Sequence, residues 1–316
     1  MKVVVLIPCY NEELTVVKVV SDFKSALPNA DVYVYDNNST DRTYDLAVKA
    51  GAIVKKELKQ GKGNVVRSMF RDIEADYYVL VDGDDTYPAE EVNQMITLAS
   101  EEGLDMLIGD RLSNGTYHQE NKRNFHGFGN KLIQTLVNWI FKSKINDIMT
   151  GYRVFSKTFV KNFPILSEGF QIETEMTMFA LNHRLRVKEF PITYRDRPEG
   201  SFSKLNTFKD GYRVLSILSA LFKHTRPFLF FGLISLVFLT ASLFVGVPVI
   251  LEFLKTHYIT LVPSAILASG LATVAFLFFV VALILDTMAY NSLIDFEYKI
   301  NMFMYRENKS KESKGD

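Results

Sequence analysis

Two long stretches without a charged residue constrain this chain more than any other feature. Residues 227–251 and residues 258–285 contain no Asp, Glu, Lys, Arg or His. A helix that crosses a bilayer needs about 20 mostly apolar residues, and each stretch is longer than that. A pair of buried core helices is the alternative, but core helices rarely run so far without a charge. The short link, residues 252–257, predicts a hairpin with both ends on one side of a membrane.

Basic residues flank the hairpin on one side. Five lie within residues 204–226 and five follow residue 285, whereas the link contains only Lys255. Lys and Arg residues that flank membrane helices are enriched on the cytoplasmic side. We therefore expect the N-terminal domain and the C-terminal tail to lie in the cytoplasm. The first residues, MKVVVLIPCYNEE, do not resemble a signal peptide, since their apolar run is short and ends at a proline. The sequence thus predicts a two-pass protein of the cytoplasmic membrane.

The composition excludes several other classes of protein. Lys plus Arg and Asp plus Glu both number 36, so no basic excess indicates a nucleic-acid partner. One cysteine, Cys9, excludes an internal disulfide framework, and five scattered histidines predict no Cys/His zinc site. With 48% hydrophobic and 23% charged residues, the chain is not of the disordered class.

Short apolar runs alternate with helical patterns before the hairpin. The runs are residues 3–7, 32–35, 52–54, 77–81 and 106–108, and the helical patterns are residues 12–26, 41–50, 64–73 and 89–100. This alternation predicts an α/β fold with a doubly wound, mostly parallel sheet. Such sheets bind ligands at the carboxyl ends of their strands.

A polar or acidic loop follows every apolar run. The loops are residues 8–13, 36–41, 61–64, 82–85 and 109–111. Because the carboxyl ends of parallel strands meet at one edge, these loops predict a single site.

The sharpest chemical signal is Asp82-Gly83-Asp84. On an extended backbone, side chains two residues apart face the same way, so both carboxylates can hold one hard cation, with Gly83 keeping the space between them open. Oxygen ligands beside a diphosphate suit Mg²⁺ or Mn²⁺. A solvated acidic turn is the alternative for a lone motif, but this motif follows a buried strand within the series of loops. We therefore predict a metal site at Asp82 and Asp84.

Other phosphate-binding and nucleophilic motifs are absent. Gly61-Lys62-Gly63 is no P-loop, because no glycine stands five residues before Gly61 and no Ser or Thr follows Lys62. No GxGxxG follows the first run, and no Ser/His/Asp arrangement is visible.

Eight segments carry a further signal: IPCYNEE, DNNSTDRT, GKGNVVR, VDGDDTYP, GDR, TGYRVFSK, GFQIETEMT and PITYRDRPEGSFSKL. Together they resemble the family-2 glycosyltransferases of the polyprenyl-phosphate type, which include dolichyl-phosphate mannose and glucose synthases and bacterial enzymes acting on undecaprenyl phosphate. The similarity covers about residues 3–225. It implies a GT-A fold and an inverting transfer from a nucleotide-sugar to a lipid phosphate.

The resemblance also implies roles for individual residues. The nucleobase and ribose would lie against Pro8, Tyr10, Asn11, Glu12 and Asp36, with Lys62 nearby, and Asp82 and Asp84 would carry the metal. Where mannose synthases place a further metal-binding Gln, this chain has Thr86, which leaves a third protein ligand open. The downstream Arg-x-x-Gly…Ser-Lys element maps to Arg197, Gly200, Ser203 and Lys204, and one extra residue lets Arg195 compete with Arg197 for the phosphate.

The chemistry explains why basic residues are needed. A phosphate nucleophile is anionic near neutral pH, so it needs cations beside an anionic donor more than it needs a general base. We expect the acceptor phosphate to bind Arg111, Arg123, Ser203 and Lys204, and the catalytic residues to be Asp84, Arg111, Arg197 and Lys204.

For two further residues, Glu175 and Arg153, a structural role is considered beside a catalytic one. Glu175 sits where some relatives place a catalytic acid, but orienting a loop or helix is the commoner role. We expect Arg153 to pair with Asp147 or Asp110 and so to brace the site.

The sequence divides the chain into four parts. These are a catalytic domain over residues 1–205, a juxtamembrane amphipathic helix over 206–226, two transmembrane helices within 227–285, and a tail over 286–316. The 206–226 helix lies in the membrane interface or, alternatively, packs on the domain. Residues 290–305 predict a second interfacial or oligomer-forming helix.

The sequence leaves two alternative functions and more than one sugar donor to consider. A processive polysaccharide synthase would carry Gln-x-x-Arg-Trp, but the only tryptophan, Trp139, lies outside such a motif. A non-catalytic membrane scaffold of the same fold is a second alternative, which the intact Asp82 and Asp84 oppose. The RPEGSFSKL form resembles users of UDP-glucose or UDP-N-acetylglucosamine more than users of GDP-mannose. The sugar, the lipid and the possible homo-oligomer are not decided by the sequence.

Overall fold

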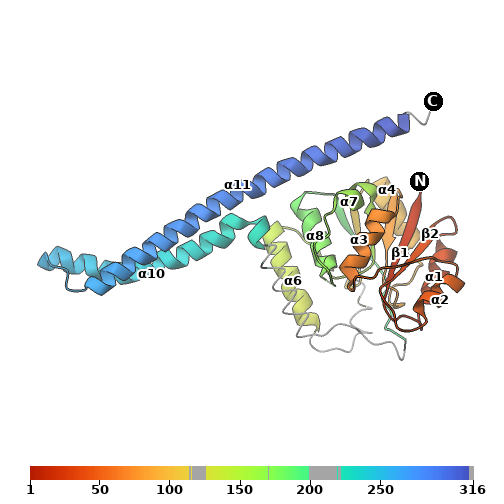
Figure 1. The fold of residues 1–316 in the computed structure, drawn as a ribbon, viewed down its shortest axis with the longest axis horizontal. Coiled ribbons are helices and arrows are strands. Elements are labelled where there is room, and N and C mark those ends of the chain that lie inside the picture. Colours follow the sequence, from red (N-terminus) through yellow and green to blue (C-terminus); the bar gives the residue numbers. More distant parts are fainter. Residues whose placement is uncertain (114, 116–125, 170, 199–218, 220–221, 313–316) are drawn as a thin grey trace. The chain divides into compact units, whose positions relative to one another are not determined.

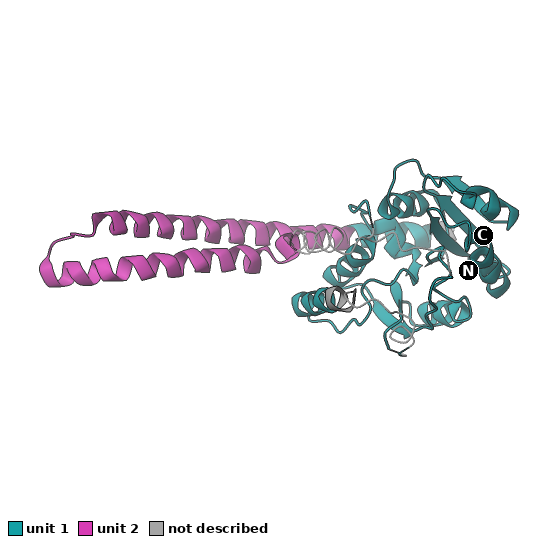
Figure 2. Cartoon of the chain, turned by 90° about the horizontal axis from the view of Figure 1, so that it is seen from below, with its two compact units in different colours: residues 1–214, 299–316 teal, residues 215–298 magenta. Residues whose placement is uncertain are grey.

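The computed structural model of the chain describes residues 1–113, 115, 126–169, 171–198, 219 and 222–312. It falls into two compact units, coloured separately in Figure 2. Unit 1 comprises Met1–Val214 and Lys299–Asp316, and unit 2 comprises Leu215–Tyr298.

Unit 1 is built on a seven-stranded sheet with the order β3-β2-β1-β4-β6-β5-β7. Its strand β6 pairs antiparallel with β4 and β5, and the other pairs are parallel. The predicted mostly parallel sheet is therefore confirmed. The strands are β1 (Val3–Cys9), β2 (Asp31–Asp36), β3 (Ile53–Lys56), β4 (Tyr77–Leu80), β5 (Met106–Asp110), β6 (Arg153–Ser156) and β7 (Val187–Pro191).

Helices cover both faces of this sheet (Figure 1). On one face, the apolar sides of α1 and α4 pack on Val5 and Ile7 of β1. On the other, Phe70 of α3 and Phe159 of α7 contact Phe155 of β6. The helices of unit 1 before the hairpin are α1 (Val16–Ala26), α2 (Thr43–Lys49), α3 (Lys62–Asp72), α4 (Val92–Glu101), α6 (His126–Phe141), α7 (Lys157–Asn162) and α8 (Ile172–Asn182).

The two-sided cover explains the sequence of β1. Val4, Val5 and Leu6 are all fully buried, although successive strand residues point to opposite faces. A strand buried on both faces reads as a continuous apolar run, which is the pattern that predicted it.

Up to residue 110, every predicted strand and helix is present, but some of them begin or end at other residues than predicted. The helix α3 begins at Lys62, where the pattern predicted Asn64, so Lys62 lies in the first helical turn. The strand β3 runs to Lys56, beyond the predicted end at Val54. The strands β6 and β7 were not predicted.

Unit 2 contains a helical hairpin, of which the second helix runs on past the end of this unit at Tyr298. The helices α10 (Pro227–Thr256) and α11 (Val262–Glu312) are long and apolar enough, by length and composition, to cross a membrane. They lie side by side in Figure 2, joined by hydrogen bonds from Ser235 Oγ to the Ala275 carbonyl at 2.7 Å and from Ser242 Oγ to the Ala268 carbonyl at 2.8 Å. Buried residues recur at intervals of seven in both helices, as in a coiled coil. They are Ser235, Ser242 and Val249 in α10 and Ala268, Ala275 and Ala282 in α11.

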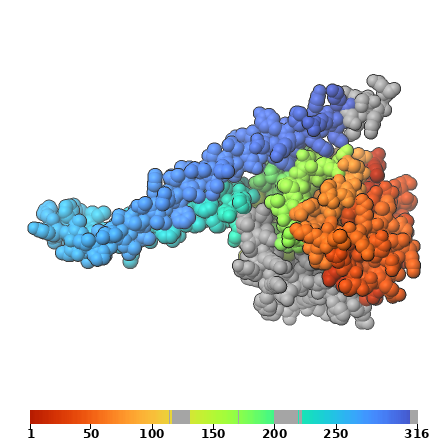
Figure 3. Space-filling view, viewed as in Figure 1, coloured from red at the N-terminus to blue at the C-terminus, as the bar shows by residue number. Residues whose placement is uncertain are grey.

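The outer surface of the hairpin is apolar. Leu236, Val237 and Phe244 are more than half exposed. Figure 3 shows the two helices of the hairpin, in cyan to blue, lying against each other. Such a surface suits lipid contact better than water.

The helix α11 continues without a break to Glu312, whereas the sequence analysis separated residues 258–285 from a helix at 290–305. Residues 286–312 contain neither proline nor glycine, so nothing in the chain ends the helix there. The predicted juxtamembrane helix over 206–226 lies mostly outside the described residues.

Candidate active site

Hydrogen bonds tie the loops after β1 and β2 together at the predicted sheet edge. The Asn11 amide N–H donates to Ser39 Oγ at 2.9 Å, and Asn11 Oδ1 accepts from the Thr40 amide at 2.8 Å. The Glu12 amide donates to Thr43 Oγ1 at 2.7 Å. The predicted nucleoside residues of the two loops thus belong to one surface.

Asp36 lies at the end of β2 and has an unsatisfied oxygen. Its carboxylate is buried, and its Oδ1 has no hydrogen-bond partner among the described residues. A buried acceptor without a partner carries a desolvation cost, which a ligand N–H or O–H can remove. Nearby, Pro8 lies in β1 opposite Tyr35, and Tyr10 is 37% exposed.

Backbone strain gathers in these loops. Of six non-glycine residues with positive φ among those described, Asn11, Asn38 and Asp85 lie at this edge, with φ of 53°, 60° and 60°. Such conformations are uncommon and tend to cluster at functional sites.

The Asp82-Gly83-Asp84 motif follows β4 as a turn and not as the extended segment assumed from the sequence. Thr15 Oγ1 donates to the Gly83 carbonyl at 2.6 Å and anchors the turn. A β-carbon at Gly83 would lie 2.6 Å from Cys9 Sγ, so the glycine is needed for packing against β1.

The second carboxylate of the motif, Asp84, is buried and fully engaged. Its Oδ1 accepts from the Thr86 amide at 3.2 Å and from Thr86 Oγ1 at 2.6 Å, and its Oδ2 forms an ion pair with Arg197. Thr86 therefore holds Asp84 in place.

The first carboxylate, Asp82, has a different cation. Lys62 Nζ lies 2.5 Å from Asp82 Oδ1 and 2.5 Å from Glu173 Oε1, and the Lys62 side chain is 9% exposed. Burial alone lowers the pKa of this ammonium, but the charges of Asp82 and Glu173 outweigh burial and hold the pKa above its ordinary value. Lys62 is therefore a fixed positive charge.

Two glycines let the start of α3 approach the loop before α8. β-Carbons at Gly61 and Gly63 would lie 2.1 Å from the Glu168 carbonyl oxygen and 2.0 Å from that of Ser167. The Gly63 amide donates to the Glu168 carbonyl at 3.0 Å. The GKG segment, which is no P-loop, thus serves to bring Lys62 and α8 together.

Glu175 has the loop-orienting role. Its two carboxylate oxygens accept from the amides of Leu166 and Ser167, each at 2.9 Å. The residue that faces Lys62 is Glu173, which the sequence analysis did not single out. The feature that could have indicated it is a run of polar residues in a helix that is buried on most sides: Glu173, Thr174, Glu175 and Thr177 are all buried.

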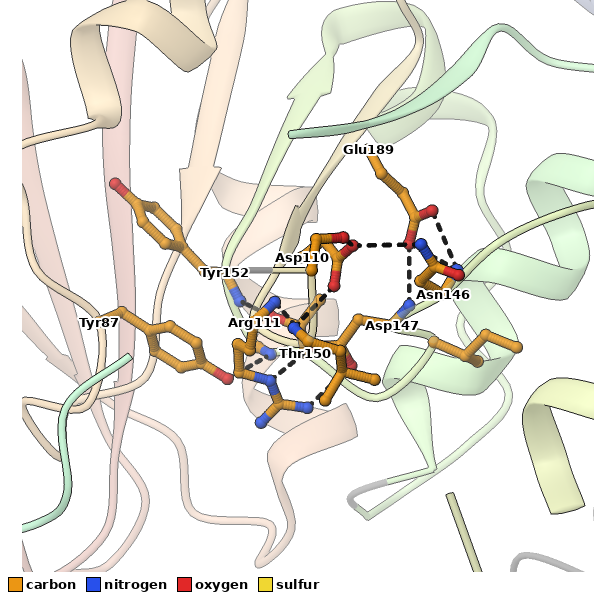
Figure 4. A network of polar contacts seen from close by, with 12 residues as sticks. Tyr87, Asp110, Arg111, Asn146, Asp147, Thr150, Tyr152 and Glu189 are labelled. Atoms are coloured by element: carbon orange, nitrogen blue, oxygen red, sulfur yellow. Dashed lines mark hydrogen bonds and ion pairs between the residues drawn. The ribbon is translucent and has the colours of Figure 1, made fainter. Parts of the chain in front are cut away.

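Arg111 is held rigidly by a network of polar contacts with Asp147 (Figure 4). Its Nε and Nη2 donate to the two oxygens of Asp147 at 2.7 and 2.9 Å. Its guanidinium lies 5.9 Å from the Tyr87 ring centre, and Glu189 in turn accepts from the Asp147 amide at 2.8 Å. Bidentate pairing of this kind fixes the orientation of an arginine.

Arg153 does not pair with Asp147 or Asp110, so that expectation is wrong. Its guanidinium donates to the carbonyls of Thr150 and Ile148 at 3.1 and 2.6 Å and to Thr177 Oγ1 at 2.8 Å. Burial lowers the pKa of Arg153 to about 10, which still leaves it charged at neutral pH. Arg111 takes the bracing pair with Asp147 because it lies next to Asp110 at the end of β5.

The segment after β7 brings a second cation to the edge. The Arg195 amide donates to the Thr86 carbonyl at 3.0 Å, and the Arg195 side chain pairs with Glu90 at 2.7 Å. The next arginine, Arg197, reaches Asp84. This geometry favours Arg197 over Arg195 as the site residue.

The donor set suits a hard cation that also binds a ligand. No group of three or more His, Cys, Asp or Glu is placed to hold a metal within the described part of the chain. The Asp82 and Asp84 carboxylates offer hard oxygens, and Asp82 Oδ2 packs against Gly151, where a β-carbon would lie 2.3 Å away. Mg²⁺ is commonly held by one or two carboxylates together with substrate phosphates, so two carboxylates fit it.

The sequence model described as "Glycosyl transferase family 2" matches residues 4–163, which is just over half of the chain and spans β1 to α7. The chain belongs to glycosyl transferase family 2. The predicted family and its GT-A fold are thereby confirmed.

Individual relatives of this family-2 chain agree. It is 35% identical to "Glycosyltransferase AglJ" of Haloferax volcanii over 73% of this chain and 75% of that protein. It is 27% identical to "Dolichyl-phosphate hexose transferase" of the same organism over 66% of this chain and 88% of that protein.

A solved structure shows the same fold. Glucosyl-3-phosphoglycerate synthase from Mycobacterium tuberculosis, in complex with Mn²⁺, UDP-glucose and phosphoglyceric acid, superposes with a TM-score of 0.56 at 18% identity. The match covers 70% of this chain and 79% of that one.

The structure thus gathers most predicted site residues of this family-2 domain at one sheet edge. Asp36 ends β2, and the others follow the ends of β1, β3, β4, β5 and β7: Asn11, Glu12, Lys62, Asp82, Asp84, Arg111 and Arg197. Arg123, Gly200, Ser203 and Lys204 lie outside the described residues.

Proposed function

We propose that this family-2 chain is a membrane-bound inverting glycosyltransferase that moves one sugar from a nucleotide-sugar to a polyprenyl phosphate. The observation that carries the proposal is the pairing of two features on one chain. A carboxylate pair with a cation on each member lies at the sheet edge, and two apolar helices follow the domain. Two carboxylates can share a divalent cation with the diphosphate of a donor. A membrane anchor holds the domain near an acceptor whose lipid chain lies in the bilayer.

The donor would lie across the loops after β1, β2 and β4. The unsatisfied Asp36 oxygen supports nucleoside binding there, beside Tyr10 and Asn11. Asp82 and Asp84 would hold Mg²⁺ or Mn²⁺, which when bound would neutralise the departing diphosphate. We favour UDP over GDP, and UDP-glucose or UDP-N-acetylglucosamine as donor, in line with the RPEGSFSKL segment and with the UDP-glucose bound by the structural neighbour. GDP-mannose is the alternative.

The acceptor phosphate would be bound by basic residues. An oxygen of the lipid phosphate attacks the anomeric carbon, the bond from that carbon to the nucleoside diphosphate breaks, and the configuration inverts. No proton need be removed from the phosphate, so no general base is required. Arg111, Arg197 and Lys204 would supply the positive charge that brings two anions together, with Arg123 and Ser203 completing the acceptor site.

The relatives' names support a lipid phosphate as acceptor, since one is called a dolichyl-phosphate hexose transferase. Basic residues on both flanks of the hairpin support a cytoplasmic catalytic domain in a two-pass protein. Undecaprenyl and dolichyl phosphate are both compatible with the charges described.

A donor and acceptor screen tests this function. We expect purified full-length protein with Mn²⁺ to release a nucleoside diphosphate from one of UDP-glucose, UDP-N-acetylglucosamine or GDP-mannose only when undecaprenyl or dolichyl phosphate is added. Release that does not depend on the lipid phosphate, or no release with any combination, would contradict the proposal and favour a non-catalytic scaffold.

A further inference from the structure

Glu173 carries a buried charge to which the reaction described so far gives no role. Its residue is 5% exposed, and Oε1 accepts from Lys62 Nζ at 2.5 Å. Burying a carboxylate is costly unless it is paired and hydrogen-bonded. Its partner is the Lys62 ammonium, which also donates a hydrogen bond to Asp82 Oδ1. Lys62 therefore links Glu173 to Asp82, one of the two predicted metal ligands.

The fold around Glu173 brings it to Lys62 from a distant part of the sequence. Lys62 is the first residue of α3, and Glu173 lies in the first turn of α8. Gly61 and Gly63 permit the contact between the two segments, and Arg67 Nη2 donates to the Ile165 carbonyl at 2.6 Å to secure it. The arrangement is therefore part of the packing between α3 and the loop before α8.

We propose that Glu173 is a positioning residue of the transfer site. By accepting one hydrogen bond from Lys62, it keeps the ammonium on Oδ1 of Asp82 and leaves Oδ2 of Asp82 for the cation and diphosphate of the donor. The proposal rests on the proposed function, because it concerns the ligand assigned there.

The hydrogen-bonding capacity of lysine explains why such a device is needed. An ammonium has three donors on a flexible stem, so an unrestrained Lys62 could reach both oxygens of one carboxylate. Lys62 donates to Oδ1 of Asp82, whereas the whole Asp82 carboxylate lies against Gly151, so the lysine and not the packing distinguishes the two oxygens. Glu173 draws one donor of Lys62 to itself and thereby keeps Lys62 from competing for Oδ2 of Asp82.

Charge acts in the same direction. Asp82, Lys62 and Glu173 together carry a net charge of one negative unit when all three are ionised, which attracts a divalent cation. Without the Glu173 charge the three groups are neutral, and the cation is bound less tightly.

The test uses Mn²⁺ alone as the probe, with full-length protein in detergent. Free Mn²⁺ is measured by electron paramagnetic resonance, and the fraction bound at the site is defined as the part lost in Asp84→Asn. We expect Glu173→Gln, which keeps the size of the side chain but removes its charge, to weaken Mn²⁺ binding by more than about tenfold. The loss of a unit charge several ångströms from a divalent cation costs about tenfold even at a dielectric constant near 80, and the released Lys62 then also competes with the cation for Asp82.

Two further variants separate positioning from other effects. In a Lys62→Met background, adding Glu173→Gln should weaken Mn²⁺ binding by a clearly smaller factor than Glu173→Gln does alone, because only the charge of Glu173 is then lost and no ammonium is left to position. This double variant also removes the whole buried ion pair, which proteins often tolerate, so it serves if Glu173→Gln alone fails to fold. The matched control is Glu168→Gln, whose exposed carboxylate pairs with Lys59 at the surface and whose loss should leave Mn²⁺ affinity unchanged.

The outcomes distinguish this inference from the proposed function. Wild-type binding with an unchanged affinity in Glu173→Gln, or an equal loss in the presence and absence of Lys62, would overturn the positioning role alone. Wild-type protein that binds no Mn²⁺ at Asp84 would overturn the metal assignment and the positioning role together.

Discussion

At the scale of single residues, the two carboxylates of the Asp82-Gly83-Asp84 turn are held by cations of different mobility. Lys62 is 9% exposed in its side chain, lies in a helix and bridges two carboxylates. Arg197 is 25% exposed and lies in the segment after β7. A metal that arrives at this pair would displace Arg197 from Asp84 more readily than it would displace Lys62 from Asp82.

The first prediction at this scale concerns the carboxylates. We expect Asp84→Asn and Asp82→Asn each to lower turnover by at least about 10²-fold, because the charge that holds the metal beside the leaving diphosphate is lost. Far-ultraviolet circular dichroism should stay as in the wild type. EDTA should abolish wild-type activity, and added Mg²⁺ or Mn²⁺ should restore it. Near-normal turnover in either variant would show that the metal assignment is wrong.

The second prediction concerns Arg197, whose guanidinium occupies Asp84 Oδ2. We expect Arg197→Gln to bind Mn²⁺ more tightly than the wild type without nucleotide, because a competing cation is gone, and yet to transfer sugar more slowly. Arg195→Gln is the matched control, since Arg195 pairs with Glu90 at the surface. Weaker Mn²⁺ binding in Arg197→Gln would contradict the competition between arginine and metal.

At the scale of elements, the start of α3 has a sequence dictated by close approach. Gly63 is helical, and an alanine at a helical glycine ordinarily stabilises a protein by up to about 1 kcal/mol. Here the added β-carbon would lie 2.0 Å from the Ser167 carbonyl oxygen, so backbone must move. The clash reverses the usual sign.

We therefore expect Gly63→Ala to destabilise unit 1 by about 1–3 kcal/mol, the range for overpacked sites. The fluorescence of Trp139, the only tryptophan, reports thermal unfolding of unit 1. Gly270→Ala is the control, because an added β-carbon at this helical glycine meets no atom within 4 Å. An unchanged or raised midpoint in Gly63→Ala would refute the close approach of α3 to residues 167–168.

Elements differ in how well the sequence predicts them, for physical reasons. Strands β1 and β4 are buried on both faces and therefore appear as apolar runs. Strand β6 has only four residues and begins with the buried Arg153, so no apolar run marks it. Helix α8 is buried on most sides and shows no single apolar stripe.

The same distinction holds for the candidate site. Asp36, Asp82 and Asp84 could be predicted because they lie at or just after the carboxyl ends of strands, and these ends meet at one edge. Glu173 could not, because it reaches the edge from a helix through Lys62, and that meeting depends on the packing of α3 against the loop before α8.

At the scale of the whole molecule, the residues assigned to the donor and those of the apolar hairpin belong to different units. The donor loops all lie in unit 1, and the hairpin makes up most of unit 2. We expect a chain lacking residues 227–316 to fold and to bind the nucleotide-sugar as the full chain does. It should transfer sugar poorly to a long-chain lipid phosphate, because nothing holds the site at the bilayer.

Calorimetric titration with the nucleotide-sugar and transfer to a long-chain and a short-chain polyprenyl phosphate check this prediction. The short-chain acceptor is the control, since it does not require a membrane. Full transfer to the long-chain acceptor by the truncated protein would show that the hairpin is not needed to hold the site at the membrane.

The most direct test of the central claim is the mass of the lipid product. Full-length protein is incubated with a polyprenyl phosphate, Mn²⁺ and the donor that supports nucleotide release, and the lipid is analysed by mass spectrometry, with Asp84→Asn as the inactive control. We predict that the polyprenyl phosphate gains the mass of one sugar residue and no more. An unchanged lipid despite nucleotide release, or a series of lipids with several sugars, would contradict the transfer of a single sugar to a lipid phosphate.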